Sequence, residues 1–150
     1  MSLEAKIMAE MKQAMLNKDE SGLRGIRAIK AAIILAKTEK GSTGEINEEQ
    51  EIKLLQKLVK SRRDSLEIFQ KENRADLAQK EIEEIAVIEK FLPQQMNADD
   101  LKVYLKSLID KLGVTDAKGM GQIMGAANKE LAGKADGKSI SSIVKELLGN

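Results

Sequence analysis

The sequence contains no cysteine, no histidine and no tryptophan, and among its 150 residues there is one proline, one tyrosine and two phenylalanines. Without cysteine there can be no disulfide, no thiolate nucleophile and no Cys-type zinc site. Without histidine, the usual general base and the commonest metal ligand are missing. These absences exclude most familiar active sites. We therefore predict no catalytic, cofactor-binding or metal-binding residue.

Long apolar runs and a strong charge bias are also missing. No stretch reaches the ~18 apolar residues of a membrane span, and the N-terminus has no apolar run typical of a signal peptide. The net charge of +1 argues against a strongly basic nucleic-acid binder, because counterion release requires a local excess of Lys and Arg. We expect a cytoplasmic protein with no membrane partner and no DNA partner.

The apolar residues that are present recur with the period of an α-helix. They make up 42% of the chain, enough for a globular core. No segment alternates with period two, so the pattern predicts an all-α protein. Pro93 follows a long helical pattern and would end it. We place a boundary there and predict an N-terminal helical domain, residues 1–92, and a C-terminal three-helix domain, residues 96–150.

Four helices are predicted before Pro93, over residues 3–17, 23–37, 47–70 and from about 77 to the proline. Asn47 and Gln50 have the spacing of a capping box. The first helix is expected to bury an apolar stripe that includes Met8 and Met15. Helical spacing also places Ile82 on the buried face of the fourth helix.

Three helices are predicted after Pro93. Asn97 can cap the first, and Thr115 or Asp116 can cap the second. Both of the later helices have apolar residues at helical spacing. In the second of the three helices these are Met120, Ile123, Met124, Ala127 and Leu131, and in the third they are Ile140, Ile143, Val144 and Leu147. Gly133 suits the end of one helix and Asp136 the cap of the next.

Acidic residues on the fourth predicted helix are the best candidates for acid–base chemistry. Glu81, Glu83 and Glu84 alternate with Lys80 and Lys90. General acid–base catalysis needs a carboxylate whose pKa is shifted by burial or by a like charge. We interpret these three as a solvated face without a catalytic role.

The turn between the last two helices is the strongest candidate binding site. Lys134 and Lys138 flank Asp136 at a helix N-terminus, whose free N–H groups favour an anion such as phosphate. Lys118 and Lys129 could extend this basic patch. An equally good alternative is that the turn has only a structural role. Gly121 and Gly125, one turn apart, are expected to allow close helix packing.

A second basic stripe lies on the third predicted helix. Lys53, Lys57 and Lys60 share a face, and Arg62 and Arg63 broaden it. The preferred interpretation is that these residues are solvated partners of acidic neighbours. The basic residues of the second helix, which could follow a phosphate backbone but are interpreted as ordinary surface, are Arg24, Arg27, Lys30 and Lys37.

Several segments together resemble the GatB/YqeY family. They are Arg62-Arg-Asp-Ser65, Arg74-Ala-Asp-Leu-Ala-x-x-Glu81, Phe91-Leu-Pro-Gln-Gln95 and the stretch from Met120 to Leu148. The last of these is similar to the tail domain of the B subunit of glutamine-dependent tRNA amidotransferases. The match covers most of the chain, although Asn73 stands where many relatives have glycine.

The resemblance implies a non-catalytic accessory protein that binds folded tRNA through backbone contacts. The alternative is a protein-interaction module that docks on an amidotransferase or an aminoacyl-tRNA synthetase. A third function, carbon–nitrogen ligase activity with glutamine as amido-N-donor, is implied by the family label alone. The sequence offers no nucleophile and no P-loop to support it. No cofactor is expected.

Overall fold

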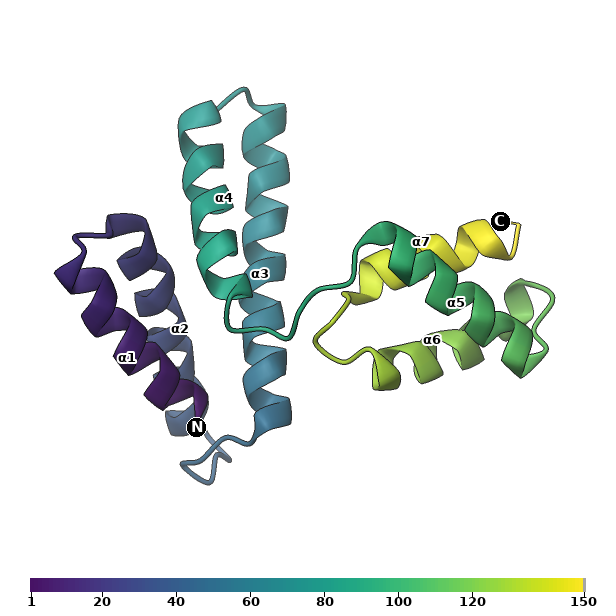
Figure 1. The fold of residues 1–150 in the computed structure, drawn as a ribbon, viewed down its shortest axis with the longest axis horizontal. Coiled ribbons are helices and arrows are strands. Elements are labelled where there is room, and N and C mark those ends of the chain that lie inside the picture. Colours follow the sequence, from purple (N-terminus) through teal and green to yellow (C-terminus); the bar gives the residue numbers. More distant parts are fainter. Residues whose placement is uncertain (150) are drawn as a thin grey trace. The chain divides into compact units, whose positions relative to one another are not determined.

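The computed structural model describes residues 1–149, and Figure 1 shows that this part of the chain is built from helices. It contains no β-strand there, which confirms the predicted all-α class. The elements are α1 (Leu3–Leu16), α2 (Glu20–Thr38), α3 (Glu48–Lys71), α4 (Ala75–Glu89), α5 (Ala98–Leu112), the short 3-10 helix η1 (Ala117–Gly119), α6 (Met120–Glu130) and α7 (Gly137–Leu147).

Residue contacts divide the chain into two compact units, Met1–Leu92 and the part from Pro93 onward. The last turn of the first unit is not continuous with the next helix. α4 ends at Glu89, and the N–H groups of Phe91 and Leu92 close a tighter turn on the carbonyls of Ile88 and Glu89. Pro93 follows without an N–H to donate, so the helix stops where the proline predicts.

The first unit consists of two helical hairpins. α1 pairs with α2, α3 pairs with α4, and α2 also packs along α4. Helical spacing brings one apolar row from each helix to a shared core. The buried residues of this core are Leu3, Ile7, Ala14, Ile26, Ile29, Ile33, Leu55, Val59, Val87 and Ile88.

Side-chain caps determine where the helices of the first unit begin. Asn47 and Gln50 form the predicted capping box, with each side chain accepting a backbone N–H of the other residue. α2 begins earlier than the predicted residue 23. The Asp19 carboxylate accepts the N–H of Gly22 at 3.0 Å, so the helix already begins at Glu20.

The predicted buried stripe of α1 is partly wrong. Met8 and Met15 are 54% and 59% exposed, and Ile82 on α4 is 44% exposed. α1 packs mainly on α2, so only its Leu3, Ile7 and Ala14 edge is covered. The methionines lie on the flank of the helix, where nothing in the unit covers them.

The second unit packs α5, α6 and α7 around its own core. Its buried residues are Leu101, Leu105, Leu108, Ile109, Ile123, Ala127, Leu131, Ile140 and Val144. Asn97 caps α5 as predicted, and its side chain accepts the N–H of Asp100. Asp116 is also a cap, but it caps η1, which precedes α6.

Candidate functional site

The turn between α6 and α7 has a well-defined backbone. Leu131 donates its N–H to Ala127 and accepts one from Lys134 at 2.8 Å. Gly133 has a φ of 79°, the left-handed conformation that favours glycine near a helix end. The Asp136 carboxylate then caps α7 by accepting the N–H of Ser139 at 2.6 Å. The predicted helix stop and restart are therefore both present.

The segment before α5 fastens this turn from outside. The side chain of Gln95 donates to the carbonyl of Gly133 at 2.5 Å, and the N–H of Met96 donates to the carbonyl of Lys134 at 2.9 Å. Helical periodicity and capping patterns give no signal for this role of Gln95. These bonds leave Lys134 on a backbone that is held on both sides.

Two of the predicted lysines lie close in sequence on this turn. Lys134 and Lys138 are both exposed, and neither forms an ion pair within residues 1–149. Lys138 belongs to the first turn of α7, where free N–H groups carry partial positive charge. Asp136 accepts the N–H of Ser139 at this helix end, and the two exposed ammonium groups are available to an anion.

The other two candidates lie along α6. Lys129 is exposed in the last turn of α6, near the beginning of the loop, whereas Lys118 lies in η1 at the opposite end. A rise of about 1.5 Å per residue puts about 18 Å of helix between Lys118 and the end of α6. Lys118 is therefore not part of the turn, although it lies at the far end of the helix that leads to it.

The expectation that Gly121 and Gly125 serve helix packing is wrong. Both are exposed, and a Cβ atom built on either would meet no other atom within 4 Å. Gly119 is the packing glycine here, because a Cβ there would lie 2.3 Å from Val114. Lys129 follows Gly125 by four residues and shares its side of the helix. The open side of α6 thus combines two glycines with a lysine.

The second basic stripe separates into different environments. Lys53 pairs with Glu49 at 2.8 Å, while Lys57 and Lys60 are exposed without an ion pair in the described residues. Arg63 pairs with Glu89 on α4 at 2.5 Å. The Arg62 side chain is only 18% exposed. Arg62 therefore does not broaden a basic surface, contrary to the prediction.

Arg62 belongs to a cluster of charges between α2, α3 and α4. Its guanidinium donates to the Leu58 carbonyl and lies 3.7 Å from Glu84. Arg24 of α2 contacts Glu83 at 2.6 Å and Glu84 at 3.6 Å. Glu81, Glu83 and Glu84 are all half-buried, so the interpretation of these three residues as a solvated face is wrong. Packing of α4 against α2 and α3 covers them.

Glu81 is the glutamate of this cluster whose carboxylate lacks hydrogen-bond partners on one oxygen. Its Oε2 atom is buried without a hydrogen-bond partner, as is Nε of Arg62. Burial, together with the negative charge of Glu84, raises the pKa of the Glu81 carboxyl. A carboxyl with a raised pKa is a feature of acid–base sites.

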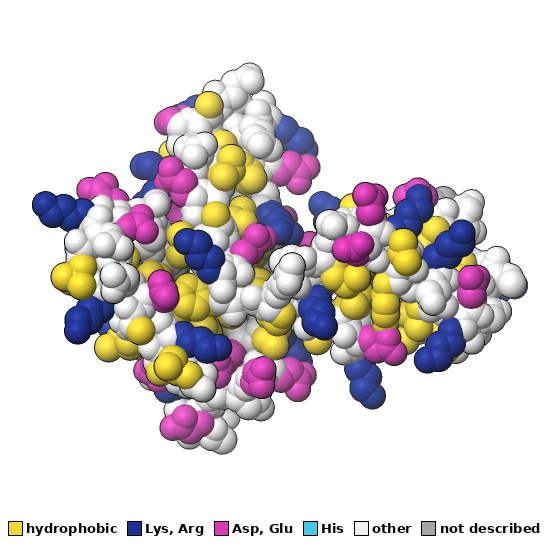
Figure 2. Space-filling model, in the orientation of Figure 1, with side chains coloured by type: hydrophobic (Ala, Val, Ile, Leu, Met, Phe, Trp, Pro, Cys, Tyr) yellow, Lys and Arg dark blue, Asp and Glu magenta, His cyan; other side chains and the backbone are white. Residues whose placement is uncertain are grey.

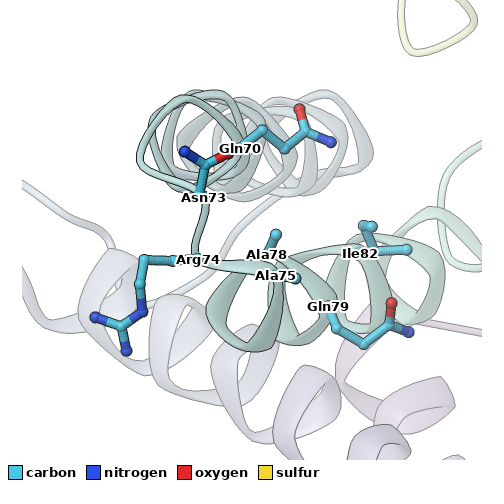
Figure 3. A pocket seen from close by; sticks show the side chains of 7 residues that line it. All are labelled: Gln70, Asn73, Arg74, Ala75, Ala78, Gln79 and Ile82. Atoms are coloured by element: carbon cyan, nitrogen blue, oxygen red, sulfur yellow. The ribbon is translucent and has the colours of Figure 1, made fainter.

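A pocket of about 390 Å³ lies at the end of the α3–α4 hairpin, and Figure 3 shows Gln70 on one helix and Ala75, Ala78, Gln79 and Ile82 on the other. The Arg74 guanidinium points away from the amides of Gln70 and Gln79 and binds both oxygens of Asp76. This hydrogen bonding lowers the pKa of Asp76 to about 2. The lining is neutral or internally paired and supplies no acid or base.

The backbone at the α3–α4 turn explains why Asn73 can stand where many relatives have glycine. Its φ is 56°, in the left-handed region. Asparagine tolerates this conformation better than other residues with a side chain, so the turn keeps its geometry. The substitution of Asn for Gly is therefore compatible with the hairpin.

Two further properties concern the described residues as a whole. None of the helices within residues 1–149 has the length and hydrophobicity required to span a membrane. Acidic side chains in the same part of the chain form no group of three or more that could hold a metal ion.

The fold and these surfaces can be compared with known proteins. The chain matches the family described as Yqey-like protein over residues 4–148, which is nearly its full length. It belongs to the YqeY-like protein family, and the resemblance seen in the sequence is confirmed.

Similar proteins are found in fungi under the name "Altered inheritance of mitochondria protein 41, mitochondrial". The protein of Pyrenophora tritici-repentis is 30% identical over 149 residues, covering 96% of this chain and 80% of its own. That of Clavispora lusitaniae is 31% identical over 134 residues, covering 87% and 77%. That of Saccharomyces cerevisiae is 30% identical over 137 residues, covering 89% and 70%. Their names place these relatives in mitochondria, and a cytoplasmic location for this chain stays a prediction.

Proposed function

We propose that this protein binds folded tRNA through phosphate contacts centred on the α6–α7 turn. The observation that carries the proposal is the pair Lys134 and Lys138, which are exposed beside a helix N-terminus and form no ion pair within residues 1–149. Charge-assisted hydrogen bonds from lysine and the partial positive charge of the helix end both favour a phosphate. The tail-domain resemblance points to the same kind of ligand.

The geometry of the turn favours backbone contacts over base recognition. Gln95 and Met96 hold the turn in one conformation, so little ordering is needed on binding. The open side of α6 has no side chain at Gly121 and Gly125, which leaves room for a sugar-phosphate backbone to approach. Tyr104, Phe69 and Phe91 are all at least partly buried, so no exposed ring offers a platform for base stacking.

Binding to folded tRNA can be measured by fluorescence anisotropy over a range of salt concentrations, with an unrelated RNA duplex of equal length as competitor. Lys134→Ala and Lys138→Ala should each reduce affinity by about 1 kcal/mol, because each removes a charge-assisted contact. Each lost contact should also reduce the magnitude of the log–log salt slope by about 0.7 to 0.9. Lys129→Ala and Lys118→Ala then report whether the contact extends along α6.

The matched control is Lys57→Ala with Lys60→Ala, which removes the same charge from exposed positions of the second stripe that form no ion pair in the described part of the chain. These variants should bind like the parent. Unchanged affinity and salt slope in the Lys134/Lys138 double variant, with an unchanged circular dichroism spectrum, would sink the proposal for this turn. A loss confined to the Lys57/Lys60 variant would move the RNA contact to α3.

A protein-interaction module that docks on an amidotransferase or aminoacyl-tRNA synthetase is the second candidate. It is supported by the same rigid turn, which could equally receive an acidic protein surface. Saturable binding to such a partner, without any tRNA binding, would favour it. Carbon–nitrogen ligase activity ranks third. Amidated product from misacylated tRNA, ATP and glutamine, lost on Glu81→Gln substitution, would be the result that promotes it.

A further inference from the structure

α1 carries an apolar face that its own unit leaves uncovered. Met8, Met15 and Leu16 are 54%, 59% and 68% exposed, and Met11 between them is half-buried against the core. With Lys12 these residues line a shallow hollow of about 380 Å³. Figure 2 shows hydrophobic side chains mixed with Lys or Arg side chains on the surface over α1. We refer to these five residues as the methionine face.

The side of α2 next to the methionine face can be identified from an ion pair. Glu4 of α1 contacts Lys37 of α2 at 2.6 Å, so these two positions face each other across the hairpin. Successive turns along α1 from Glu4 lead to Met8, Met11 and Met15. Successive turns back along α2 from Lys37 lead to Ile34, Lys30 and Arg27. The apolar surface therefore continues onto Ile34, which is 51% exposed.

A surface of this kind differs from scattered exposed side chains. Single exposed hydrophobic residues are normal, but neighbouring ones on one face indicate an interaction site. Methionine is flexible and polarizable, and it is over-represented on surfaces that receive amphipathic helices. The face extends from Met8 to Leu16, about 12 Å along the axis, or slightly more than two helical turns. That length matches apolar anchors at positions i, i+4 and i+7 of a docked helix.

The charged residues beside the hollow indicate which charge a bound helix must carry. Lys12, Arg27 and Lys30 are exposed, and none forms an ion pair within residues 1–149. Glu4, the carboxylate at the end of the face, is already engaged by Lys37. The border along the middle of the face is thus positive and uncompensated. Complementarity requires carboxylates on the partner.

We propose that the methionine face binds an amphipathic helix of another protein, whose apolar stripe is bordered by acidic residues. The hollow would receive one apolar side chain of that helix, with Met8 and Met15 packing on either side. Lys12, Arg27 and Lys30 would pair with its acidic border. This inference does not depend on RNA binding at the α6–α7 turn, because it concerns a different unit of the chain.

The probes are fluorescent helical peptides tested with the full-length protein. One panel has Leu at i, i+4 and i+7 in several registers with Glu along both borders. A second panel has the same Leu positions with Lys in place of Glu. Vesicles containing phosphatidylglycerol test an anionic membrane as the occupant. Sedimentation of the protein alone tests a second copy of the chain.

The first variants change the apolar contact and leave the fold intact. Met8→Gln with Met15→Gln should weaken binding of the Glu-bordered peptide by at least about tenfold, the effect of losing about 1.4 kcal/mol. Leu35→Gln with Val103→Gln is the matched control, since both residues are exposed outside the face, by 66% and 71%. This control variant should bind like the parent. Exposed positions of this kind are expected to leave stability nearly unchanged.

The second variants test charge. Lys12→Glu with Lys30→Glu should weaken the Glu-bordered peptide and strengthen the Lys-bordered one, each by about tenfold. The proposal is overturned if no Glu-bordered peptide binds, if both panels bind equally, or if the Met8/Met15 variant binds like the parent. It is also overturned if the face binds only vesicles, or if the protein dimerises through it and the Met8/Met15 variant is monomeric.

Discussion

At the scale of single residues, Arg62 and Arg63 show how far two identical neighbours can differ. Arg62 is mostly buried and bonded to a backbone carbonyl and to Glu84, whereas Arg63 is about half exposed and reaches Glu89. Successive residues of an α-helix are turned by about 100° around the helix axis. One arginine therefore enters the α3–α4 interface while the next lies at its edge. The sequence pattern assigned both to one surface because it contained no information on which helix packs there.

Arg62→Ala should destabilise the protein by about 2–3 kcal/mol, because it leaves Glu81 and Glu84 half-buried with less positive charge nearby and removes buried methylene groups. Arg63→Ala, its neighbour, should cost less than about 1 kcal/mol, as is usual for a surface pair. Urea unfolding of both variants measures the difference. Equal destabilisation would contradict the assignment of Arg62 to the interface.

Glu81 supplies a prediction with a pH dependence. Its folded pKa lies above the ordinary value of 4.5, so the charged form is disfavoured in the folded state. Its unfavourable contribution is absent below the unfolded pKa and develops as the pH rises through the folded pKa. Glu81→Gln should therefore stabilise the protein at pH 7, by up to about 1 kcal/mol, and much less at pH 4.

Urea unfolding at the two pH values tests this, with Glu83→Gln as the control. Glu83 accepts a hydrogen bond from Arg24, so neutralising it should destabilise the protein at pH 7. A Glu81→Gln variant that is less stable than the parent at pH 7, or that differs equally at both pH values, would show that the carboxylate is compensated.

At the scale of helices, the glycines show where two helices approach each other closely and where they do not. A Cβ at Gly25 of α2 would lie 2.6 Å from Cγ1 of Val87 on α4, so this glycine allows the two helices to approach. Gly121 and Gly125 on α6 meet nothing. Their i, i+4 spacing is typical of close helix packing, which is why packing was the prediction from sequence. The spacing shows only that two residues share a face; it does not show whether a neighbour covers that face.

Gly25→Ala should destabilise the protein by about 1–3 kcal/mol, because Val87 is β-branched and has little freedom to move aside. Gly125→Ala should instead stabilise it by about 0.5–1 kcal/mol, the usual difference between alanine and glycine within a helix. Thermal unfolding distinguishes the two. A stabilising Gly25→Ala would mean that α2 and α4 separate easily at this point.

At the scale of the whole molecule, the contacts define two units joined at Pro93. That each unit is an independent folding domain stays a prediction. Pro93 and the two glutamines after it carry no backbone N–H bond in the described residues, while Met96 is already bonded to Lys134. The junction thus comprises residues 93–95. Gly41 and Gly44, both with positive φ, mark a second open segment, between α2 and α3.

Limited proteolysis with a protease of broad specificity should cut first within residues 93–95 or 41–44, because a protease needs several residues of extended, unbonded backbone. Mass spectrometry of the earliest fragments locates the cuts. The interior of α3, whose backbone is hydrogen-bonded in a helix, serves as the internal comparison. Early cleavage there would show that the α3–α4 hairpin opens before either loop.

The sequence by itself determined the features that depend on neighbours along the chain. Helical periodicity, the Asn47 capping box, the Asp136 cap and the stop at Pro93 all follow from interactions within a few residues. The family match also rests on sequence alone. Lys134 and Lys138 were identified for the same reason, because a charged turn at a capped helix is a local feature.

Only the tertiary structure decided which faces are covered. Periodicity places Met8 with the core residues of α1, Glu81 on a charged side of α4, and Gly125 at a packing position. Their actual environments depend on where α2, α3 and the rest of the chain lie. Burial is a property of contacts between distant segments, and the chain does not encode it in any short window. For that reason the methionine face and the Arg62–Glu81 cluster became visible only in the folded molecule.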